Sequence, residues 1–207
     1  MSIQTRRERE RAERERLIVT AARDLAEAEG WDAVTTRRLA AEIEYSQPVL
    51  YSHFKGKGAI MAAVAVRGCE ELTADLRAST ASAEGAYGRI AAVGRAYTDF
   101  GRRRPALYDA MFTHLVDLPF ATPEAPAPLQ EAFGELLRSV EPFAREGEDL
   151  ALLTETFWAG LHGLVTLMRS GRLPEQAHDR RLALLVERFA PQDPMAGTEH
   201  RGAAERA

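Results

Sequence analysis

Apolar residues recur every three or four positions along most of the chain, which is the spacing of one face of an α-helix. No stretch shows the alternation of apolar and polar residues that indicates a strand. Gly30 stands where a left-handed residue would end the first helix. The face of that helix is formed by Leu17, Ile18, Ala21, Ala22 and Leu25. The pattern therefore predicts an all-α protein.

A short second helix is expected after Thr35, which is a suitable N-cap. Its inner face would be Leu39, Ala40 and Ile43. A third helix is expected to begin at Ser46, with a proline in its first turn. Proline is tolerated there because the first N–H groups of a helix have no intrahelical partner.

The third helix, within the stretch SQPVLYSHF at residues 46–54, is expected to be held at only two points. Leu50 and Phe54 are four positions apart and would anchor it on the core. Tyr51 and His53 would then face away from that pair. The helix would present an exposed and rigid first turn.

Longer helical patterns follow residue 57, including one over residues 150–171 that is apolar nearly all round. Pro105 is placed as a first-turn residue of a further helix. The segment DLPFATPEAPAP must be a loop, because proline lacks the donor that a helix interior needs. The polar stretch from residue 191 to residue 207 lacks periodicity, and we expect it to be disordered.

Composition is that of a globular protein, with 45% hydrophobic and 28% charged residues. The net charge of −4 taken alone argues against a nucleic-acid partner. Residues 1–57, however, carry 11 basic and 10 acidic residues, whereas residues 58–207 carry 16 basic and 21 acidic residues. The small positive excess is therefore confined to the first 57 residues. Cys69 is the single cysteine, so no intrachain disulfide is expected. With no signal-like start and no apolar run of about 20 residues, we expect a cytoplasmic protein without a membrane partner.

The third helix has the arrangement of a recognition helix, whose N-terminal residues meet base edges in the major groove. Gln47 matches the N6 and N7 edge of adenine, and Pro48 and Val49 can touch a thymine methyl group. Backbone phosphates would be reached by Tyr51, His53 and Lys57. From the start of the second helix we expect Thr36 and Arg37 in the same groove, with Arg38 at the backbone.

The segment TTRRLAAEIEYSQPVLYSHFKGKGAIM resembles the DNA-binding segment of the TetR family of bacterial repressors, and the resemblance covers residues 16–61. It implies a DNA-binding dimer with no enzyme activity, whose contacts carry over onto Thr36, Arg37, Gln47, Pro48, Val49, Tyr51, His53 and Lys57. The domains would be a three-helix helix-turn-helix domain at 1–57, a ligand-binding and dimerisation domain at 58–190 and a disordered tail at 191–207. One departure is Glu44, where the family usually has glycine.

The run RRERERAERER is expected to form a solvated helix, because its arginines and glutamates nearly cancel. The alternative is a flexible arm over residues 1–12 that places Arg6 and Arg7 in a minor groove.

An apolar small-molecule effector is the expected ligand of the second domain. Candidate lining residues are Tyr97, Phe100, Tyr108, Met111, Phe112, Phe133, Trp158 and His162. Each aromatic or methionine position among them is individually more typical of a core. Trp158 and His162 belong to FWAGLHG, which resembles a W-x-x-x-H-G element of some TetR-family C-terminal domains.

The apolar helix over residues 150–171 needs cover on more than one side, and a symmetric four-helix dimer interface would supply it. The expected interface residues are Leu161, Leu164, Val165, Met168, Leu182, Leu185 and Phe189. A central core helix within one subunit is the alternative.

Catalysis, cofactors and metals have little support in the sequence. The five histidines do not fall at metal-ligand spacings, and no glycine-rich phosphate loop is present. We expect a ligand-responsive repressor that binds a palindromic operator as a homodimer. The alternatives are a transcriptional activator, or a helical ligand-binding protein or small enzyme that does not bind DNA.

Overall fold

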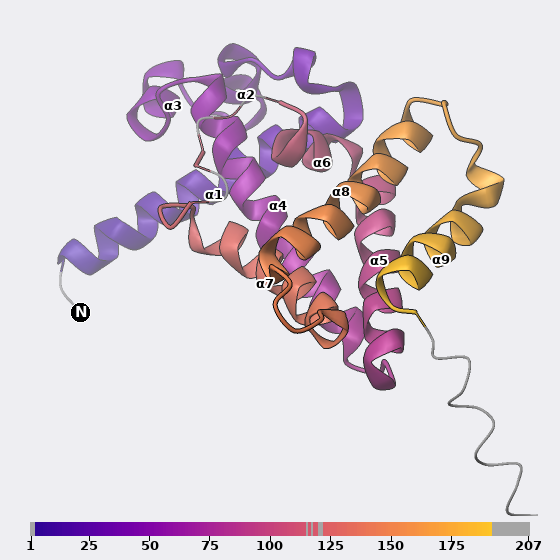
Figure 1. Ribbon diagram of the computed structural model, residues 1–207. Helices are drawn as coiled ribbons and strands as arrows, with labels where there is room; N and C mark the ends of the chain where they lie inside the picture. Colours follow the sequence, from indigo (N-terminus) through magenta and orange to yellow (C-terminus); the bar gives the residue numbers. More distant parts are fainter. Residues whose placement is uncertain (1–2, 115, 117, 120–121, 192–207) are drawn as a thin grey trace, which may run out of the picture. The chain divides into compact units, whose positions relative to one another are not determined.

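The computed structural model describes residues 3–114, 116, 118–119 and 122–191 of the chain (Figure 1). Every regular element in these residues is helical, which confirms the all-α prediction. The α-helices are α1 (Ile3–Glu29), α2 (Thr36–Glu42), α3 (Gln47–His53), α4 (Lys57–Thr80), α5 (Gly85–Arg103), α6 (Pro105–Phe112), α7 (Ala127–Val140), α8 (Leu150–Arg169) and α9 (His178–Phe189). Three short 3-10 helices are η1 (Trp31–Ala33), η2 (Glu141–Phe143) and η3 (Glu175–Ala177). Most of the expected disordered tail, from residue 192 onward, lies outside the described residues.

The chain forms two compact units. The first, called here the HTH unit, consists of Met1–Ala78 and Asp99–Glu135. The second, called the C-terminal unit, consists of Ser79–Thr98 and Leu136–Ala207. The division of function after residue 57 stays a prediction.

The core of the HTH unit is built from the faces that the periodicity predicts. Ile18 and Ala22 of α1 are fully buried, as is Leu39 of α2. The helix starts also agree: the Thr35 hydroxyl accepts a hydrogen bond from the Arg38 N–H at 3.2 Å, and α6 begins at Pro105. Ser46 occupies the N-cap position of α3 but makes no capping hydrogen bond with its side chain. Residues 3–12, for which a flexible arm was the alternative, continue α1 as a helix.

The turn between α2 and α3 has the hydrogen bonds of a Schellman motif, in which the residue after the C-cap is left-handed. Tyr45 donates to the Ala40 carbonyl at 2.8 Å, and Glu44 donates to the Ala41 carbonyl at 3.3 Å. Glu44 has φ 56°, the one positive φ among the non-glycine residues described. A backbone that favours glycine therefore carries a charged side chain.

Replacing Glu44 by glycine should raise the free energy of unfolding by about 0.5–1 kcal/mol, because the left-handed backbone no longer strains a β-carbon. Glu44→Gln is the matched control, since it removes the carboxylate but keeps the strain. Thermal or urea unfolding should show an increased stability for Glu44→Gly and none for Glu44→Gln. Equal stability of the two variants would contradict this account of the turn.

The C-terminal unit packs α8 closely against α9 and α5. Phe157 of α8 is fully buried, and its ring centroid lies 5.1 Å from that of Phe189. A β-carbon at Gly160 would approach Leu185 to 2.8 Å, and one at Gly94 would approach Leu182 to 3.1 Å. Glycines therefore allow these helices to cross at short distance.

Burial corrects part of the expected dimer interface. Leu161 and Val165 are 0% exposed and Leu182 is 4% exposed, so these three residues belong to the core of their own unit. The remaining four residues predicted there are half-buried: Leu164, Met168, Leu185 and Phe189.

The sequence predicted no segment long and apolar enough to cross a membrane, but α8 is such a segment by its length and composition. Its most apolar window has a mean hydropathy of 1.3 and is 22% buried. Helices that pack inside globular proteins meet the same criterion. Since little of that window is buried, α8 leaves a large apolar face outside the core of its unit.

Candidate nucleic-acid interface

Helix α3 is anchored at its centre and exposed at its N-terminal end. Leu50 is 0% exposed, whereas Gln47 and Pro48, the first two residues of α3, are exposed. Val49 is 37% exposed and Tyr51 is 52% exposed. The expected outward display of Gln47, Pro48, Val49 and Tyr51 is therefore present within the HTH unit.

The C-terminal end of α3 differs from the prediction. The His53 side chain is only 6% exposed, and its Nδ1 lies 3.3 Å from Oε1 of Glu15 on α1. Phe54 is half-buried and forms the C-cap of α3, where the backbone becomes extended. His53, which was expected to face outward, therefore lies inward and ties α3 to α1.

Glu15 interacts with a second side chain besides His53. Its carboxylate also accepts a hydrogen bond from Arg11 at 2.9 Å. Burial alone would raise the pKa of Glu15, but the hydrogen bonds from Arg11 and His53 outweigh it and hold the pKa below its usual value. The ionised carboxylate is thus the form that the fold favours.

The start of α2 lies beside α3, as predicted. The hydroxyl oxygens of Thr36 and Tyr51 are 3.3 Å apart, and Arg37 is exposed. Arg38 is held differently, because its guanidinium donates two hydrogen bonds to the Glu29 carboxylate at the end of α1, one of them 2.7 Å long. The side-chain hydrogen bond from Arg38 is the main cause that lowers the pKa of Glu29.

Lys57, expected at a phosphate, has a partner within the HTH unit. Its ammonium group donates to the backbone carbonyl of Trp31, and the residue is half-buried. Arg38, His53 and Lys57 thus each have a partner inside the unit. Each partner lies more than seven positions away in the sequence from the side chain that it binds, so periodicity could not reveal these contacts.

Two sequence models of one family match the chain. The model described as "Bacterial regulatory proteins, tetR family" matches residues 18–64, from the middle of α1 into α4. The model described as "Tetracyclin repressor-like, C-terminal domain" matches residues 90–189, from α5 to the end of α9. The chain belongs to the TetR family. It is accordingly a TetR-family transcriptional regulator.

Other proteins and solved structures resemble most of the chain. An uncharacterized HTH-type transcriptional regulator of Mycobacterium tuberculosis is 26% identical over 184 residues, which are 89% of this chain and 81% of the relative. A protein of unknown function from Rhodococcus sp. RHA1 has a TM-score of 0.70 and 25% identity, covering 84% of this chain and 92% of that one. A TetR-family transcriptional regulator from Streptomyces coelicolor shares the fold at a TM-score of 0.60 and 19% identity, covering 85% and 96%.

The expected effector-binding residues of this TetR-family chain fall into two groups, one in each unit. Tyr97, Trp158 and His162 belong to the C-terminal unit, where the Trp158 Nε1–H donates to the Tyr97 hydroxyl at 2.8 Å. The ring centroids of Trp158 and His162 are 6.3 Å apart. The HTH unit contains the others: Phe100, Tyr108, Met111, Phe112 and Phe133.

Burial differs among these residues within each unit. Tyr97, Phe100 and Tyr108 are 0% exposed and Met111 is 2% exposed, whereas Phe112, Phe133, Trp158 and His162 are half-buried. Burial, and secondarily the charge of Arg169, lower the pKa of His162 below its usual value. Burial therefore favours the neutral imidazole, which has one nitrogen that donates and one that accepts a hydrogen bond.

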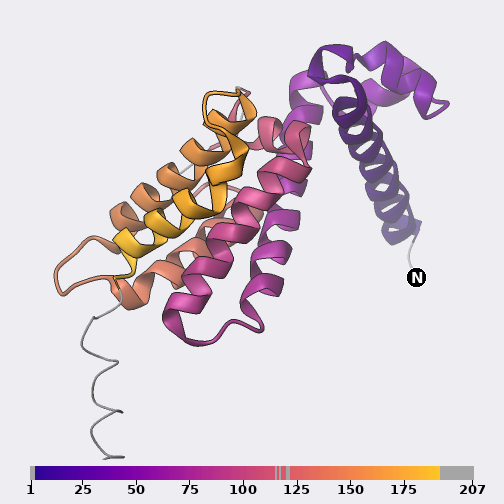
Figure 2. The same cartoon turned by 90° about the vertical axis from the view of Figure 1, so that its right-hand side faces the viewer.

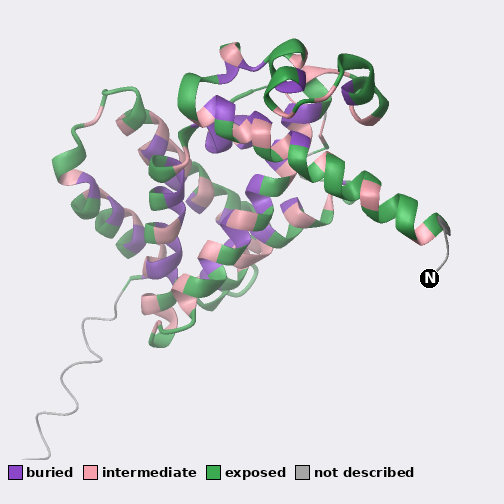
Figure 3. Ribbon diagram, turned by 180° about the vertical axis from the view of Figure 1, so that it is seen from behind, coloured by how far each residue is buried: buried purple, intermediate pink, exposed green. Residues whose placement is uncertain are grey.

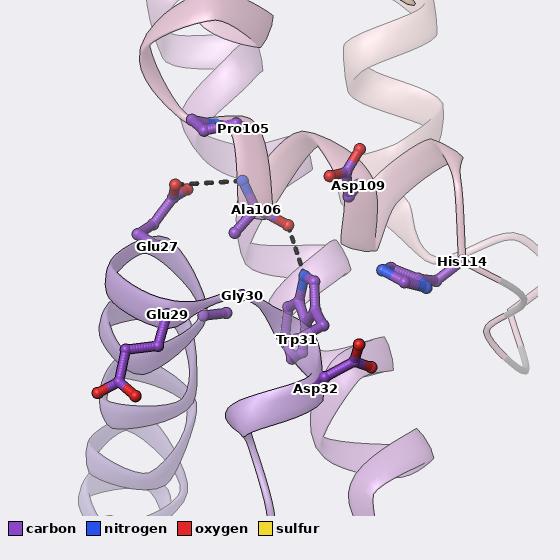
Figure 4. Close-up of a pocket in the computed structure, with 10 residues that line it drawn as sticks. Glu27, Glu29, Gly30, Trp31, Asp32, Pro105, Ala106, Asp109 and His114 are labelled. Atoms are coloured by element: carbon purple, nitrogen blue, oxygen red, sulfur yellow. Dashed lines mark hydrogen bonds between the residues drawn. The ribbon is translucent and has the colours of Figure 1, made fainter. Parts of the chain in front are cut away.

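A cleft of about 380 Å³ in the HTH unit lies between the end of α1 and α6 (Figure 4). The Glu27 carboxylate accepts hydrogen bonds from the backbone N–H groups of Ala106 at 3.1 Å and Leu107 at 3.0 Å. The Trp31 Nε1–H donates to the Ala106 carbonyl at 2.8 Å. Glu27 therefore supplies a cap for the first turn of α6, where the N–H groups have no helical partner.

These contacts were not predicted from the sequence. Glu27 and Trp31 are separated from α6 by more than 70 positions, and neither helix pattern nor motif links them. The only local signal is Pro105, which marks the start of the helix that they hold.

Proposed function

We propose that this TetR-family regulator is a cytoplasmic repressor that binds a palindromic DNA operator as a homodimer and releases it when an apolar small molecule binds. The observation that carries DNA binding is the exposed N-terminal turn of α3, with Gln47, Pro48 and Val49 outside the core while Leu50 is fully buried. Such an end can enter a major groove.

Selection of duplexes from a random pool by the full-length protein tests this proposal. The expected result is one sequence with two inverted half-sites about 34–36 Å, or a multiple of that distance, apart. Screening metabolites for release of that duplex would then identify the effector. Failure to enrich any sequence would favour a helical protein without DNA binding, and activated transcription in a reporter assay would favour an activator.

The proposed dimer uses the outer face of α8. Leu152 is 60% exposed and Leu167 is 41% exposed, and Thr156, Ala159 and Gly163 lie between them at spacings of three and four residues. A second copy of α8 could approach closely along these small residues. In the proposed interface, these outer residues of α8 take the place of Leu161, Val165 and Leu182, which are buried in the core of the protomer.

Helix α6 is the proposed link between effector and DNA. It carries the candidate effector residues Tyr108, Met111 and Phe112, and its first turn is hydrogen-bonded to Glu27 and Trp31 beside α2. An effector that binds better to a shifted α6 would change the position of α1 and thereby the spacing of the two recognition helices.

Glu27→Gln should weaken this link, because an amide accepts less strongly than a carboxylate from two helix N–H groups. We expect the factor by which effector lowers operator affinity, about 5–150-fold for typical allosteric coupling, to fall toward one. Glu29→Gln is the control, since Glu29 bonds to Arg38 and has no hydrogen bond to α6 in the described structure. An unchanged factor in Glu27→Gln, measured by fluorescence anisotropy, would remove α6 capping from the mechanism.

A further inference from the structure

Helix α1 begins far before the segment that defines the family. The family match starts at residue 18, whereas α1 starts at Ile3. The intervening residues add about four turns, or roughly 20 Å, to the helix. In Figure 2 this extension runs downward from the region of α2 and α3 toward the N-terminus, and Figure 3 shows it as largely exposed. Its residues 3–17 include six arginines and four glutamates.

Three of these arginines share one face with the packed part of α1. Arg7, Arg11 and Arg14 follow at spacings of four and three residues, and Ile18 comes four residues later. Ile18 is 0% exposed in the core of the HTH unit. The face that packs on the core therefore continues outward as a row of arginines.

This arginine face begins where α3 ends. Glu15, next to Arg14, makes the contact with His53 at the C-terminus of α3. Arg11 is hydrogen-bonded to the same Glu15. Arg7 and Arg14 are exposed and make no hydrogen-bonded ion pair in the described part of the chain. They are thus available to an anionic partner beside the recognition helix.

Several side chains expected at phosphates are already engaged within the described part of the HTH unit, while Arg37 and Lys55 remain exposed. Lys57 is bonded to the Trp31 carbonyl, Arg38 to Glu29 and His53 to Glu15. A DNA-binding surface on which part of the expected phosphate contacts are engaged elsewhere gains affinity from positive charge on another element. The extension of α1 supplies it.

We propose that the arginine face of the α1 extension binds backbone phosphates of the duplex flanking the half-site read by α3. This inference rests on the proposed DNA-binding function. An α-helix is about 10–12 Å wide with its side chains, and the minor groove is about 6 Å wide. The extension therefore contacts phosphates at the duplex surface and does not read bases from the minor groove. It adds affinity and salt dependence without sequence preference.

The test compares two double variants of the full-length protein with equal change of charge. Arg7→Gln with Arg14→Gln alters the arginine face, and Arg9→Gln with Arg16→Gln alters the opposite side of the helix. Glutamine and arginine have similar helix propensities, so α1 should remain helical, which circular dichroism checks. The probe is the duplex that wild-type protein selects from a random pool.

The first double variant should reduce the slope of log affinity against log salt concentration by roughly two per protomer, at about 0.9 per lost phosphate contact. Its affinity should approach that of wild type near 1 M salt, and its ranking of single-base-pair variants should not change. The second double variant should keep the wild-type slope. Shortening the flanks of the duplex by about six base pairs, roughly 20 Å at 3.4 Å per base pair, should weaken wild type and leave the first variant unaffected.

Equal reductions of the slope in the two double variants would overturn the proposal, because a general loss of charge would then explain the effect. Wild-type slopes for both would show that the extension does not touch DNA, while operator binding itself would stand. If wild-type protein selects no duplex at all, the proposed function and this inference fail together.

Discussion

Replacing Leu50 by alanine should destabilise the protein by about 2–5 kcal/mol, the usual cost of truncating a buried leucine. Leu50 is 0% exposed, and it is the one residue of α3 that is fully buried in the HTH unit. A seven-residue helix has little stability of its own, so loss of this anchor should also release α3 from its position. We expect operator binding to disappear together with the stability.

Urea unfolding and binding to the selected duplex would measure the two effects of Leu50→Ala. Leu17→Ala is the matched control in the same unit, since Leu17 is 44% exposed and its truncation should cost at most a few tenths of the Leu50 effect. A Leu50→Ala protein that keeps wild-type stability would mean that α3 is held by contacts other than this side chain.

Gly163→Arg on the outer face of α8 should convert the proposed dimer into a monomer and lower operator affinity by at least about 100-fold, because two half-sites are then bound independently. A β-carbon at Gly163 meets no atom within 4 Å in the single chain, so the substitution has room in the protomer. Sedimentation velocity at micromolar concentration and binding to the selected duplex would show both changes.

Two companions of Gly163→Arg separate an interface effect from a general one. Ala151→Arg adds the same charge to an exposed position on another side of α8 and should leave the dimer intact. Gly163→Ala should favour the α8 helix by about 0.8–1 kcal/mol in the isolated protomer, yet weaken a dimer that packs closely at this point. A dimeric Gly163→Arg protein would place the interface elsewhere.

Much of the fold follows from local pattern. Apolar spacing placed the core residues Ile18, Leu39 and Leu50 correctly, because α1, α2 and α3 each bury one face. Local chemistry marked the helix ends at Thr35 and at Pro105. The family's glycine at the turn also pointed to the positive φ that Glu44 adopts.

Side-chain partners could not be predicted in the same way. His53 turns inward because Glu15, 38 positions earlier, offers a carboxylate, and Lys57 bonds to a backbone carbonyl that carries no sequence signature. Periodicity also cannot tell a face that packs within one protomer from a face that packs against a second copy. For that reason Leu161 and Val165 were assigned to the interface although they belong to the core.

The central claim is that the exposed Gln47 end of α3 reads base edges. The most direct measurement is the affinity of Gln47→Ala for the selected duplex and for each of its single-base-pair variants, by fluorescence anisotropy at fixed salt. The account predicts a loss of discrimination of roughly 1–3 kcal/mol at one A·T pair in each half-site, with the preferences at other positions retained. An equal loss of affinity for every duplex would contradict it, because Gln47 would then contribute to binding without reading a base.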